Sequence, residues 1–383
     1  MNILFLTPEY YSKELQSCGG LGVYIRKTTA ALAARGHNVS VLWLSHRNEH
    51  WYDGDVEIEE VCSTVSRIPS FPNKLSFFHT LITFILDRIK LRRILKNKLK
   101  KGVQIIQAAS YKSPAVFCSS KWPIITRLSS LENMLITAKG QKITFKEKLF
   151  IFSEKLQLKK SVALISPSQF LAKQINNTCN KIYIVPTISE SSPTDINENF
   201  FIKYLRGKKY ILYFGQLSRI KGTDLIIDIL PDIFLKFKDI YAVFIGRDDG
   251  IFGKTCREYI SSKLYNYKDR IIFSTPLSHA ELRPCIENAT CILQPSRVDN
   301  LPNACIEALS LKKVVIGTYP TSIEELIHHG INGFLVPKED RKALAKCTID
   351  FLSGNIHIIK PGLLENKFDA ISELEKIYKM NIK

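Results

Sequence analysis

Residues 295–308 read Pro-Ser-Arg-Val-Asp-Asn-Leu-Pro-Asn-Ala-Cys-Ile-Glu-Ala, and the rest of the chain can be interpreted from this stretch. The apolar run Cys291 to Leu293 comes before it, and apolar residues at helical spacing follow. The pattern predicts a strand, a polar loop and a helix. The fixed φ of Pro302 suits a first helical turn. A helix N-terminus with free backbone N–H groups binds anions, so the stretch predicts a site for a diphosphate.

The loop and the helix carry two acids, Asp299 and Glu307, with seven residues between them. The backbone N–H groups of Asn300, Leu301 and Asn303 are expected to point into the space above the strand. Two acids joined through such a turn can accept hydrogen bonds from sugar hydroxyls. An ordinary strand–loop–helix crossing, in which both acids are solvated caps, would have the same local pattern.

This stretch resembles the signature of the retaining glycosyltransferases of the GT-B class, glycosyltransferase family 4, in which seven residues separate two glutamates. The first acid here is Asp299, one methylene shorter. The resemblance implies that Glu307 binds the ribose of a nucleotide and that Asp299 faces the transferred sugar. It extends over most of the chain. Its anchor points are Lys221-Gly222, Gly19-Gly20 and Glu307-Ala308.

Bulk composition restricts the class of protein. A length of 383 residues predicts roughly two to three domains. An apolar fraction of 45% is enough for packed cores and argues against wholesale disorder. The net charge of +18 favours acidic partners, namely phosphorylated ligands, anionic lipid or nucleic acid. Nucleic acid is suggested by charge alone, because no recognised binding module accompanies it.

The cysteines and the N-terminus predict a cytoplasmic protein. Nine cysteines without C-x-x-C spacing indicate reduced thiols and neither a disulfide framework nor a metal site. Met1 to Thr7 reads as a first strand, not as a signal peptide. No stretch reaches the roughly 18 apolar residues that a membrane span needs. The expected location is the cytoplasm, either free or peripheral on the inner face of the membrane.

The first half opens with a strand, a glycine-containing loop and a helix. Ile3 to Thr7 is the strand, apolar residues at helical spacing run from Val23 to Gly36, and Val39 to Leu44 is the next strand. This order predicts a parallel sheet. The loop is not G-x-G-x-x-G, so it is no dinucleotide fingerprint. The resemblance implies that Gly19 and Gly20 face the donor diphosphate, whereas a flexible turn would explain them equally well.

Residues 74–101 combine an apolar block with a basic run. The apolar residues are Leu75, Phe77, Phe78, Leu81, Ile82, Phe84, Ile85 and Leu86. The basic residues are Arg88, Lys90, Arg92, Arg93, Lys96, Lys98, Lys100 and Lys101. One interpretation is a helix that lies on an anionic membrane surface. The other is a core helix followed by a solvated basic helix.

Two further segments of the first half bear on function. After the strand Pro123 to Thr126 the family usually carries Arg-Leu-His-Thr, whereas Ser129 stands here in place of the histidine that would contact the donor sugar. This departure weakens inferences about the donor and about activity. Residues 144–160 predict a second basic amphipathic helix, in which phenylalanines and leucines alternate with lysines.

The second half begins with the strand Tyr210 to Phe214, followed by a basic loop. Gly215 is the first residue of this loop. Lys221, later in the same loop, matches the lysine of the family. The family arginine that follows this glycine is Gln216 here, and Arg219 is the candidate to replace it. Basic side chains at this point can stabilise a departing diphosphate. A basic surface turn is the alternative.

Two further loops of the second half carry candidate residues. Asp248 and Asp249 could suggest a metal site. No third ligand lies at a spacing typical of metal sites, so a turn is the preferred interpretation of the two aspartates. No metal is expected. Thr275-Pro276-Leu277 falls where the family's base-contacting loop lies, so Leu277 is a candidate contact of the nucleotide.

The strand–helix alternation predicts an α/β protein of GT-B type, with two facing Rossmann-like, doubly wound lobes and a C-terminal crossover helix. The expected segments are an acceptor-side domain at 1–190, a linker at 191–209, a nucleotide-sugar-binding domain at 210–360, and a helix at 361–383 that packs back on the first domain. Ligands are expected at the carboxyl ends of the strands.

The resemblance implies a retaining glycosyltransferase that moves a sugar from a UDP- or GDP-linked donor to a glycan or lipid-linked glycan, in the synthesis of a cell-surface polysaccharide such as lipopolysaccharide. The implied roles are diphosphate stabilisation by Lys221 and Arg219, and contacts with sugar hydroxyls by Asp299. The departures at Ser129, Gln216 and Asp299 leave open a catalytically silent partner of an active transferase. A GT-B sugar epimerase is a third possibility, although it would need further acids.

Overall fold

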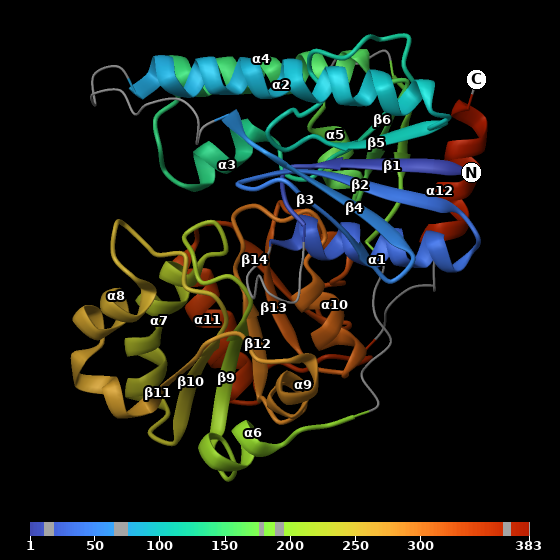
Figure 1. Ribbon diagram of the computed structural model, residues 1–383. Coiled ribbons are helices and arrows are strands. Elements are labelled where there is room, and N and C mark those ends of the chain that lie inside the picture. The colour runs from blue at the N-terminus through green and yellow to red at the C-terminus, as the bar shows by residue number, and fades with distance from the viewer. Residues whose placement is uncertain (11–18, 65–75, 176–179, 188–194, 363–368, 383) are drawn as a thin grey trace. The chain divides into compact units, whose positions relative to one another are not determined.

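The computed structural model describes residues 1–10, 19–64, 76–175, 180–187, 195–362 and 369–382. The chain forms two compact units, which are Met1–Ile188 together with Phe368–Lys383, and Ser189–Lys367 (Figure 1). Each unit has its own parallel sheet with helices on both faces. The two parallel α/β units agree with the doubly wound fold expected from the strand–helix alternation.

The first unit is built on an eight-stranded sheet of order β3-β4-β2-β1-β5-β6-β7-β8, which is parallel except for the β3–β4 pair. The strands are β1 Asn2–Thr7, β2 Asn38–Ser45, β3 Glu49–Asp53, β4 Val56–Cys62, β5 Ile105–Ala109, β6 Ile124–Arg127, β7 Ala163–Ser166 and β8 Ile182–Ile184. The sequence interpretation missed the β3–β4 hairpin. Its signal is Asp53-Gly54, a dipeptide typical of tight hairpin turns, and Gly54 has a φ of +62°.

The helices of the first unit are α1 Gly20–Ala34, α2 Ser76–Lys100, α3 Glu132–Ala138, α4 Phe145–Lys160, α5 Gln169–Lys173 and α12 Ala370–Asn381. The last of them, α12, supplies buried residues to the core around β1 and β5. The hydroxyl of Tyr378 donates to Oε1 of Gln107 at 2.5 Å. This helix begins at Ala370, later than the expected residue 361, and residues 363–368 lie outside the described part of the chain.

Helix α2 corrects the interpretation of a core helix followed by a separate basic helix. A single helix runs from Ser76 to Lys100, and its basic half packs on the sheet through Leu91 and Leu95, which are fully buried. Since leucines alternate with the cations there, one face of the basic run enters the core while the charges of the other face stay in solvent.

The second unit holds a six-stranded parallel sheet of order β11-β10-β9-β12-β13-β14. The strands are β9 Lys209–Phe214, β10 Ile240–Ile245, β11 Ile271–Ser274, β12 Cys291–Gln294, β13 Val315–Tyr319 and β14 Gly333–Pro337. The helices are α6 Asn199–Tyr204, α7 Thr223–Lys236, α8 Cys256–Lys263, α9 His279–Glu287, α10 Asn303–Ser310 and α11 Arg341–Leu352, with short 3-10 turns η3 Tyr265–Arg270 and η4 Ser322–Glu325.

The strand order of the second unit reverses next to β9. The chain builds outward from β9 to β10 and β11 and then returns to place β12 on the other side of β9. Loops that leave two neighbouring strands in opposite directions at such a point open a crevice at the carboxyl ends of the strands. The loops after β9 and β12 are therefore where a ligand of this sheet is expected.

The expected linker at 191–209 is corrected in part. Helix α6 lies within it and packs against α9, with Phe200 and Phe201 against the core that contains Cys285 and Ile286 of α9. The polar composition of the segment concealed a short helix that tertiary packing stabilises.

Candidate functional site

The loops after β9 and β12 approach each other closely. Gly222 has a φ of +73°, and a Cβ added to it would lie 2.0 Å from the carbonyl oxygen of Pro295. The backbone N–H of Arg297 donates to the carbonyl of Ile220 at 2.8 Å. Only glycine permits this approach and this conformation together, so the Lys221-Gly222 motif has a structural reason for its glycine.

The contact between these loops brings together two of the predicted residues. Nζ of Lys221 lies 2.7 Å from Oδ2 of Asp299, whose side chain is almost completely buried. The hydroxyl of Ser296 donates to the same oxygen at 3.0 Å, and the hydroxyl of Ser322 donates to the Asp299 carbonyl at 2.8 Å. The carboxylate is therefore held in place, while the lysine remains partly exposed at the switch point.

Helix α10 presents its N-terminus next to this pair. Its N-cap is Pro302, which makes no side-chain capping bond. Because Asn303 is the first helical residue, its N–H has no acceptor within the helix. The expectation for Asn300 is corrected, since its N–H donates to Oδ1 of Asp299 at 3.1 Å. A short polar side chain next to the loop N–H competes for it. Leu301 follows Asn300 in the same loop.

Glu307 lies on α10 with its carboxylate partly open to solvent. Oε1 is 3.9 Å from Nδ1 of His279, the first residue of α9. Leu277 lies two residues before that histidine and packs partly against the core under α9. The contact therefore connects the expected ribose ligand with the loop expected to contact the base. The sequence interpretation did not include His279.

Arg297 is the main residue that sequence reasoning missed. Its buried guanidinium binds the Asp224 carboxylate at 2.6 and 2.9 Å and the Glu339 carboxylate at 2.6 and 2.8 Å, and it donates to the Arg219 carbonyl. Burial acts to lower the pKa of Arg297, but the hydrogen bonds to both carboxylates raise it above that of a free guanidinium. Arg297 stands in the opening stretch, yet its partners lie 73 and 42 residues away.

The loops after β9 and β10 are also joined. The amide of Gln216, where the family has an arginine, donates to Asp249, which is paired with Arg247 at 2.6 Å. Gly215 has a φ of +127°, and a Cβ on Gly246 would lie 1.7 Å from the Gly215 carbonyl oxygen. The amide of Gln216 is thus held by the neighbouring loop.

Arg219 points toward the tip of the β10–α8 loop. Its guanidinium carbon lies 5.8 Å from the centre of the Phe252 ring. The preferred turn interpretation of Asp248 is confirmed, because its carboxylate accepts hydrogen bonds from the N–H groups of Gly250, Cys256 and Arg257. Within the described residues, no cluster of three His, Cys, Asp or Glu side chains could hold a metal ion.

Gly19 and Gly20 belong to the first unit. A Cβ on Gly19 would lie 3.0 Å from Oε1 of Glu9, whereas one on Gly20 would meet nothing within 4 Å. Gly19 forms the N-cap of α1 with a φ of −72°, and its Cβ would meet only the end of the flexible Glu9 side chain, so packing requires neither glycine. Residues 11–18 of the same loop lie outside the described part.

Ser129, which replaces the family histidine, lies at the carboxyl end of β6. Its hydroxyl is 3.2 Å from that of Ser110, and its N–H donates to the same Ser110 oxygen at 3.1 Å. The N–H of Glu132 donates to Glu154, and burial raises the pKa of Glu154 to about 8. The carboxyl end of β6 therefore carries hydroxyl groups and lies near an acid whose pKa burial raises.

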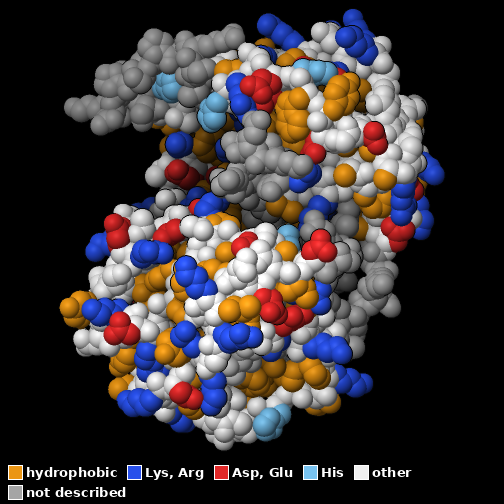
Figure 2. All heavy atoms as spheres, turned by 60° about the horizontal axis from the view of Figure 1, so that its bottom comes forward, with side chains coloured by type: hydrophobic (Ala, Val, Ile, Leu, Met, Phe, Trp, Pro, Cys, Tyr) orange, Lys and Arg blue, Asp and Glu red, His pale blue; other side chains and the backbone are white. Residues whose placement is uncertain are grey.

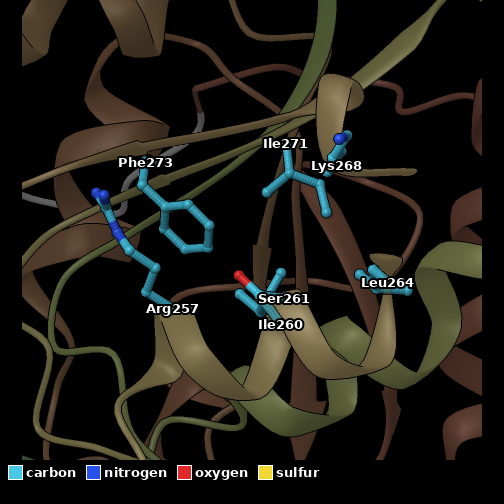
Figure 3. A pocket seen from close by; sticks show the side chains of 7 residues that line it. All are labelled: Arg257, Ile260, Ser261, Leu264, Lys268, Ile271 and Phe273. Atoms are coloured by element: carbon cyan, nitrogen blue, oxygen red, sulfur yellow. The ribbon is translucent and has the colours of Figure 1, made fainter. Parts of the chain in front are cut away.

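A cavity of about 310 Å³ lies elsewhere on the second unit, between α8, η3 and β11 (Figure 3). Its lining consists of Arg257, Ile260, Ser261, Leu264, Lys268, Ile271 and Phe273. None of the residues predicted to bind a nucleotide sugar contributes to it. The candidate site is thus defined by the loops at the switch point and not by this cavity.

Family comparisons agree with the two-unit organisation. Residues 18–188 match the family described as Glycosyltransferase Family 4, and residues 195–361 match the family described as Glycosyl transferases group 1. Spore coat protein SA of Bacillus subtilis (strain 168) is 25% identical over 164 residues, or 39% of this chain and 41% of that protein. Alpha-D-kanosaminyltransferase of Streptomyces kanamyceticus is 22% identical over 133 residues, or 35% and 33%. The chain thus matches less than half the length of these curated relatives.

Solved structures match almost the whole chain. Sucrose-phosphate synthase from Thermosynechococcus elongatus superposes with a TM-score of 0.77 at 16% identity, covering 99% of this chain and 98% of that one. WaaG, a glycosyltransferase involved in lipopolysaccharide biosynthesis, gives 0.68 at 15%, covering 99% of both chains. Anabaena Alr3699/HepE in complex with UDP and glucose gives 0.62 at 15%, covering 100% and 96%. Together with the two family matches, this shared fold shows that the chain belongs to the GT-B glycosyltransferases of family 4.

Proposed function

We propose that this chain is a retaining glycosyltransferase that uses a UDP- or GDP-linked sugar and transfers the sugar to a glycan or lipid-linked glycan in the synthesis of a cell-surface polysaccharide. The Lys221–Asp299 pair at the β9/β12 switch point carries the proposal. The complex of Alr3699/HepE with UDP and glucose supports a nucleotide-sugar donor, and the lipopolysaccharide role of WaaG supports the acceptor class.

Each candidate residue has a proposed task at the donor. Lys221, assisted by Arg219, stabilises the negative charge that develops on the departing diphosphate. The N–H of Asn303 and the α10 N-terminus bind phosphate oxygens, and Leu301 adds its N–H. Glu307 accepts hydrogen bonds from the ribose. Asp299 accepts hydrogen bonds from hydroxyls of the transferred sugar.

The remaining candidates complete the donor site. Gly215 lets the loop backbone approach the donor, and Leu277 contacts the base. Gly19 and Gly20 are proposed to contact the diphosphate. The cations take the place of a metal ion in neutralising the diphosphate, so we propose that the reaction needs none.

The proposed reaction proceeds on one face of the sugar. The bond between the anomeric carbon and the diphosphate oxygen breaks as the acceptor oxygen bonds to the same face, and the acceptor proton passes to the leaving diphosphate. The products are the retained glycoside and a nucleoside diphosphate. The role expected of the family histidine has no counterpart at Ser129, so the hydroxyl of Ser129 can supply only a neutral hydrogen bond there.

A panel of UDP- and GDP-sugars tests the proposal, with thermal shift reporting binding and nucleotide release reporting turnover. Lys221→Ala should lower turnover by about 100-fold or more, because a charge that faces the leaving group is lost. Glu307→Ala should weaken binding of the donor. Lys209→Ala and Asp239→Ala are matched controls, since they remove an exposed ion pair of 2.9 Å at the opposite end of β9.

The outcomes separate the proposed transferase from a catalytically silent partner. Donor binding without release of nucleotide, with every donor and with glycan acceptors present, would support the catalytically silent protein. The structural argument for that alternative is the hydrogen bond from the Gln216 amide to Asp249, at the position where the family has an arginine. Unchanged turnover in the Lys221→Ala, Glu307→Ala double variant would refute the residue assignment.

We also propose a cytoplasmic location. The described cysteines are all free, and burial raises the pKa of several, including Cys285 to about 12, so these thiols are unreactive. None of the helices in the described residues is long and apolar enough to pass through a bilayer.

A further inference from the structure

Helices α2 and α4 lie side by side on one face of the first unit's sheet (Figure 1). The rings of Phe77 and Phe145 are 5.8 Å apart between centroids, and those of Phe84 and Phe150 are 5.4 Å apart. The segments are about sixty residues apart in sequence, so their contact is a product of tertiary structure. Their outer side is called the α2–α4 surface below.

The α2–α4 surface exposes large apolar side chains along two parallel lines. On α2, Phe78, Ile82 and Leu86 are 54%, 41% and 41% exposed, and their spacing of four places them on one face. On α4, Phe145 and Phe152 are 67% and 63% exposed. Phe77 links the two helices, because its ring centroid lies 5.6 Å from that of Phe78 and 5.8 Å from that of Phe145. Exposed apolar groups that gather in this way mark a site of interaction.

Helix α4 reverses the usual distribution of polar and apolar residues. Its buried positions include Ser153, Glu154 and Gln157, while two of its phenylalanines face solvent. The Gln157 side chain accepts from the N–H of Ala115 at 2.8 Å and donates to the Ala109 carbonyl at 2.8 Å. The helix is therefore anchored by these buried polar groups together with Leu158, while the exposed Phe145 and Phe152 are left for a partner.

The first half of α2 is held in the same manner. The buried carboxylate of Asp87 accepts from the hydroxyl of Ser63 at 2.6 Å and from the N–H of Thr64 at 2.7 Å. Arg88 is buried, with its guanidinium carbon 3.9 Å from the Phe84 ring centre. The exposed side chains thus stand on a fixed helix, and their exposure does not come from loose packing.

The charges that surround the exposed apolar groups are basic. The exposed cations of the two helices are Arg92, Arg93, Lys96, Lys100, Lys148, Lys155 and Lys159. The acids of the same helices are buried, as with Asp87 and Glu154, or engaged, as with Glu147 in the α4 capping box. On the face in Figure 2, by contrast, acidic side chains stand between the Lys and Arg side chains.

We propose that the α2–α4 surface docks on a bilayer that contains anionic phospholipid. The phenylalanines and aliphatic side chains enter the interface between headgroups and acyl chains, and the lysines and arginines contact lipid phosphates. Because neither helix can span the bilayer, the first unit lies on the membrane surface. The proposal concerns a second site and does not depend on the transfer chemistry.

The charge pattern argues against a second copy of the chain as the occupant. In a two-fold symmetric dimer the same patch faces itself, so the lysines of α4 would meet the lysines and arginines of the other copy. Like charges brought together in this way oppose association. An anionic lipid surface is instead complementary to both the exposed apolar side chains and the exposed cations of the two helices.

Vesicle flotation of the full chain tests the proposal. The chain should float with vesicles of phosphatidylcholine mixed with phosphatidylglycerol, and much less with phosphatidylcholine alone. The variant Phe145→Ser, Phe152→Ser should lower the partition coefficient about tenfold or more, because two aromatic anchors are lost. Lys148→Glu, Lys155→Glu should abolish the preference for anionic vesicles and remove its dependence on salt.

Control variants distinguish binding through the α2–α4 surface from nonspecific binding of the protein to vesicles. Leu235→Ser removes an apolar side chain of similar exposure from the second unit, 60%, and should leave flotation unchanged. The pair Phe78→Ser, Ile82→Ser tests the α2 line independently of α4, in case one helix tolerates substitution poorly. Nucleotide binding should persist in all these variants, so a failure of the membrane proposal and a failure of the proposed transferase give different results.

Three results would overturn the proposal. The first is equal flotation with neutral and anionic vesicles. The second is unchanged flotation after substitution of both phenylalanine pairs in folded protein. The third is sedimentation that shows a dimer of the wild-type chain which the Phe145→Ser, Phe152→Ser variant loses, since the surface would then belong to a second copy.

Discussion

At the scale of single residues, Arg297 organises the candidate site without being exposed to a ligand. Its guanidinium joins four segments, which are its own loop after β12, the carbonyl of Arg219 after β9, Asp224 at the start of α7 and Glu339 before α11. The hydrogen bond to Arg297 lowers the pKa of Glu339. A buried arginine with all its partners present is stable, but removal of one partner leaves a buried charge.

We expect Arg297→Met to lower the free energy of unfolding by about 3–5 kcal/mol, because the Asp224 carboxylate loses its counter-charge while it stays buried. Urea unfolding measures the change. Arg341→Met is the comparison variant, since its arginine is mostly exposed where it pairs with Asp228, and its loss should cost about 1 kcal/mol or less. The double variant Arg297→Met, Asp224→Asn should recover part of the loss. A cost for Arg297→Met similar to that of Arg341→Met would show that the cluster is unimportant.

At the scale of secondary-structure elements, the site depends on how close two loops come. The left-handed conformation of Gly222 turns the chain into α7, and the absence of a side chain there admits the Pro295 carbonyl. Lys221 therefore reaches Asp299 because its neighbour is glycine. The strand order places the loops after β9 and β12 next to each other, and Gly222 determines how closely they approach.

Gly222→Ala should destabilise the second unit and weaken donor binding, because the added Cβ combines an unfavourable φ with a clash against backbone. Gly54→Ala isolates the first effect, since Gly54 has a φ of +62° with nothing within 4 Å of a Cβ. That control should cost about 1–2 kcal/mol. We expect Gly222→Ala to cost at least about 2 kcal/mol more. Equal losses in thermal unfolding would mean that the Pro295 loop moves aside without cost.

At the scale of the whole molecule, the chain returns to its first unit after completing the second. Helix α12 packs its buried residues against the core formed by β1, β5 and α1. Its N-terminus is fixed through Asp369, which accepts from the N–H of Ser372 and from Arg35 at 2.9 Å. Residues near the C-terminus therefore contribute to the stability of a unit built mainly from residues near the N-terminus.

Leu374→Ala should lower the stability of the first unit by about 2–5 kcal/mol, because a fully buried leucine leaves a cavity. Hydrogen exchange should show faster exchange in β1 and β2 and little change in β9 and β10. Met380→Ala, at an exposed position of the same helix, should leave both unchanged. Faster exchange in the second unit alone would contradict the assignment of α12 to the first.

Several features of the fold and the site followed from local patterns. The Asp299–Glu307 spacing, the Lys221-Gly222 step and the strands before them predicted which loops bear the candidate groups, because each is a property of neighbouring residues. The Asn300 N–H was predicted to be free and is not, since a side chain one residue away competes for it. The sequence interpretation missed the β3–β4 hairpin, although the dipeptide Asp53-Gly54 is typical of hairpin turns.

By itself, the sequence determined the alternation of strands and helices and the positions of the motif residues, because periodicity and turn preference act over a few residues. Only the tertiary structure decided that Arg297 meets Asp224 and Glu339, that the basic half of α2 enters the core, and that α4 buries its polar residues while exposing phenylalanine. Those outcomes depend on which distant segments the sheets bring into contact, and the free energy of burial is fixed only when that contact exists.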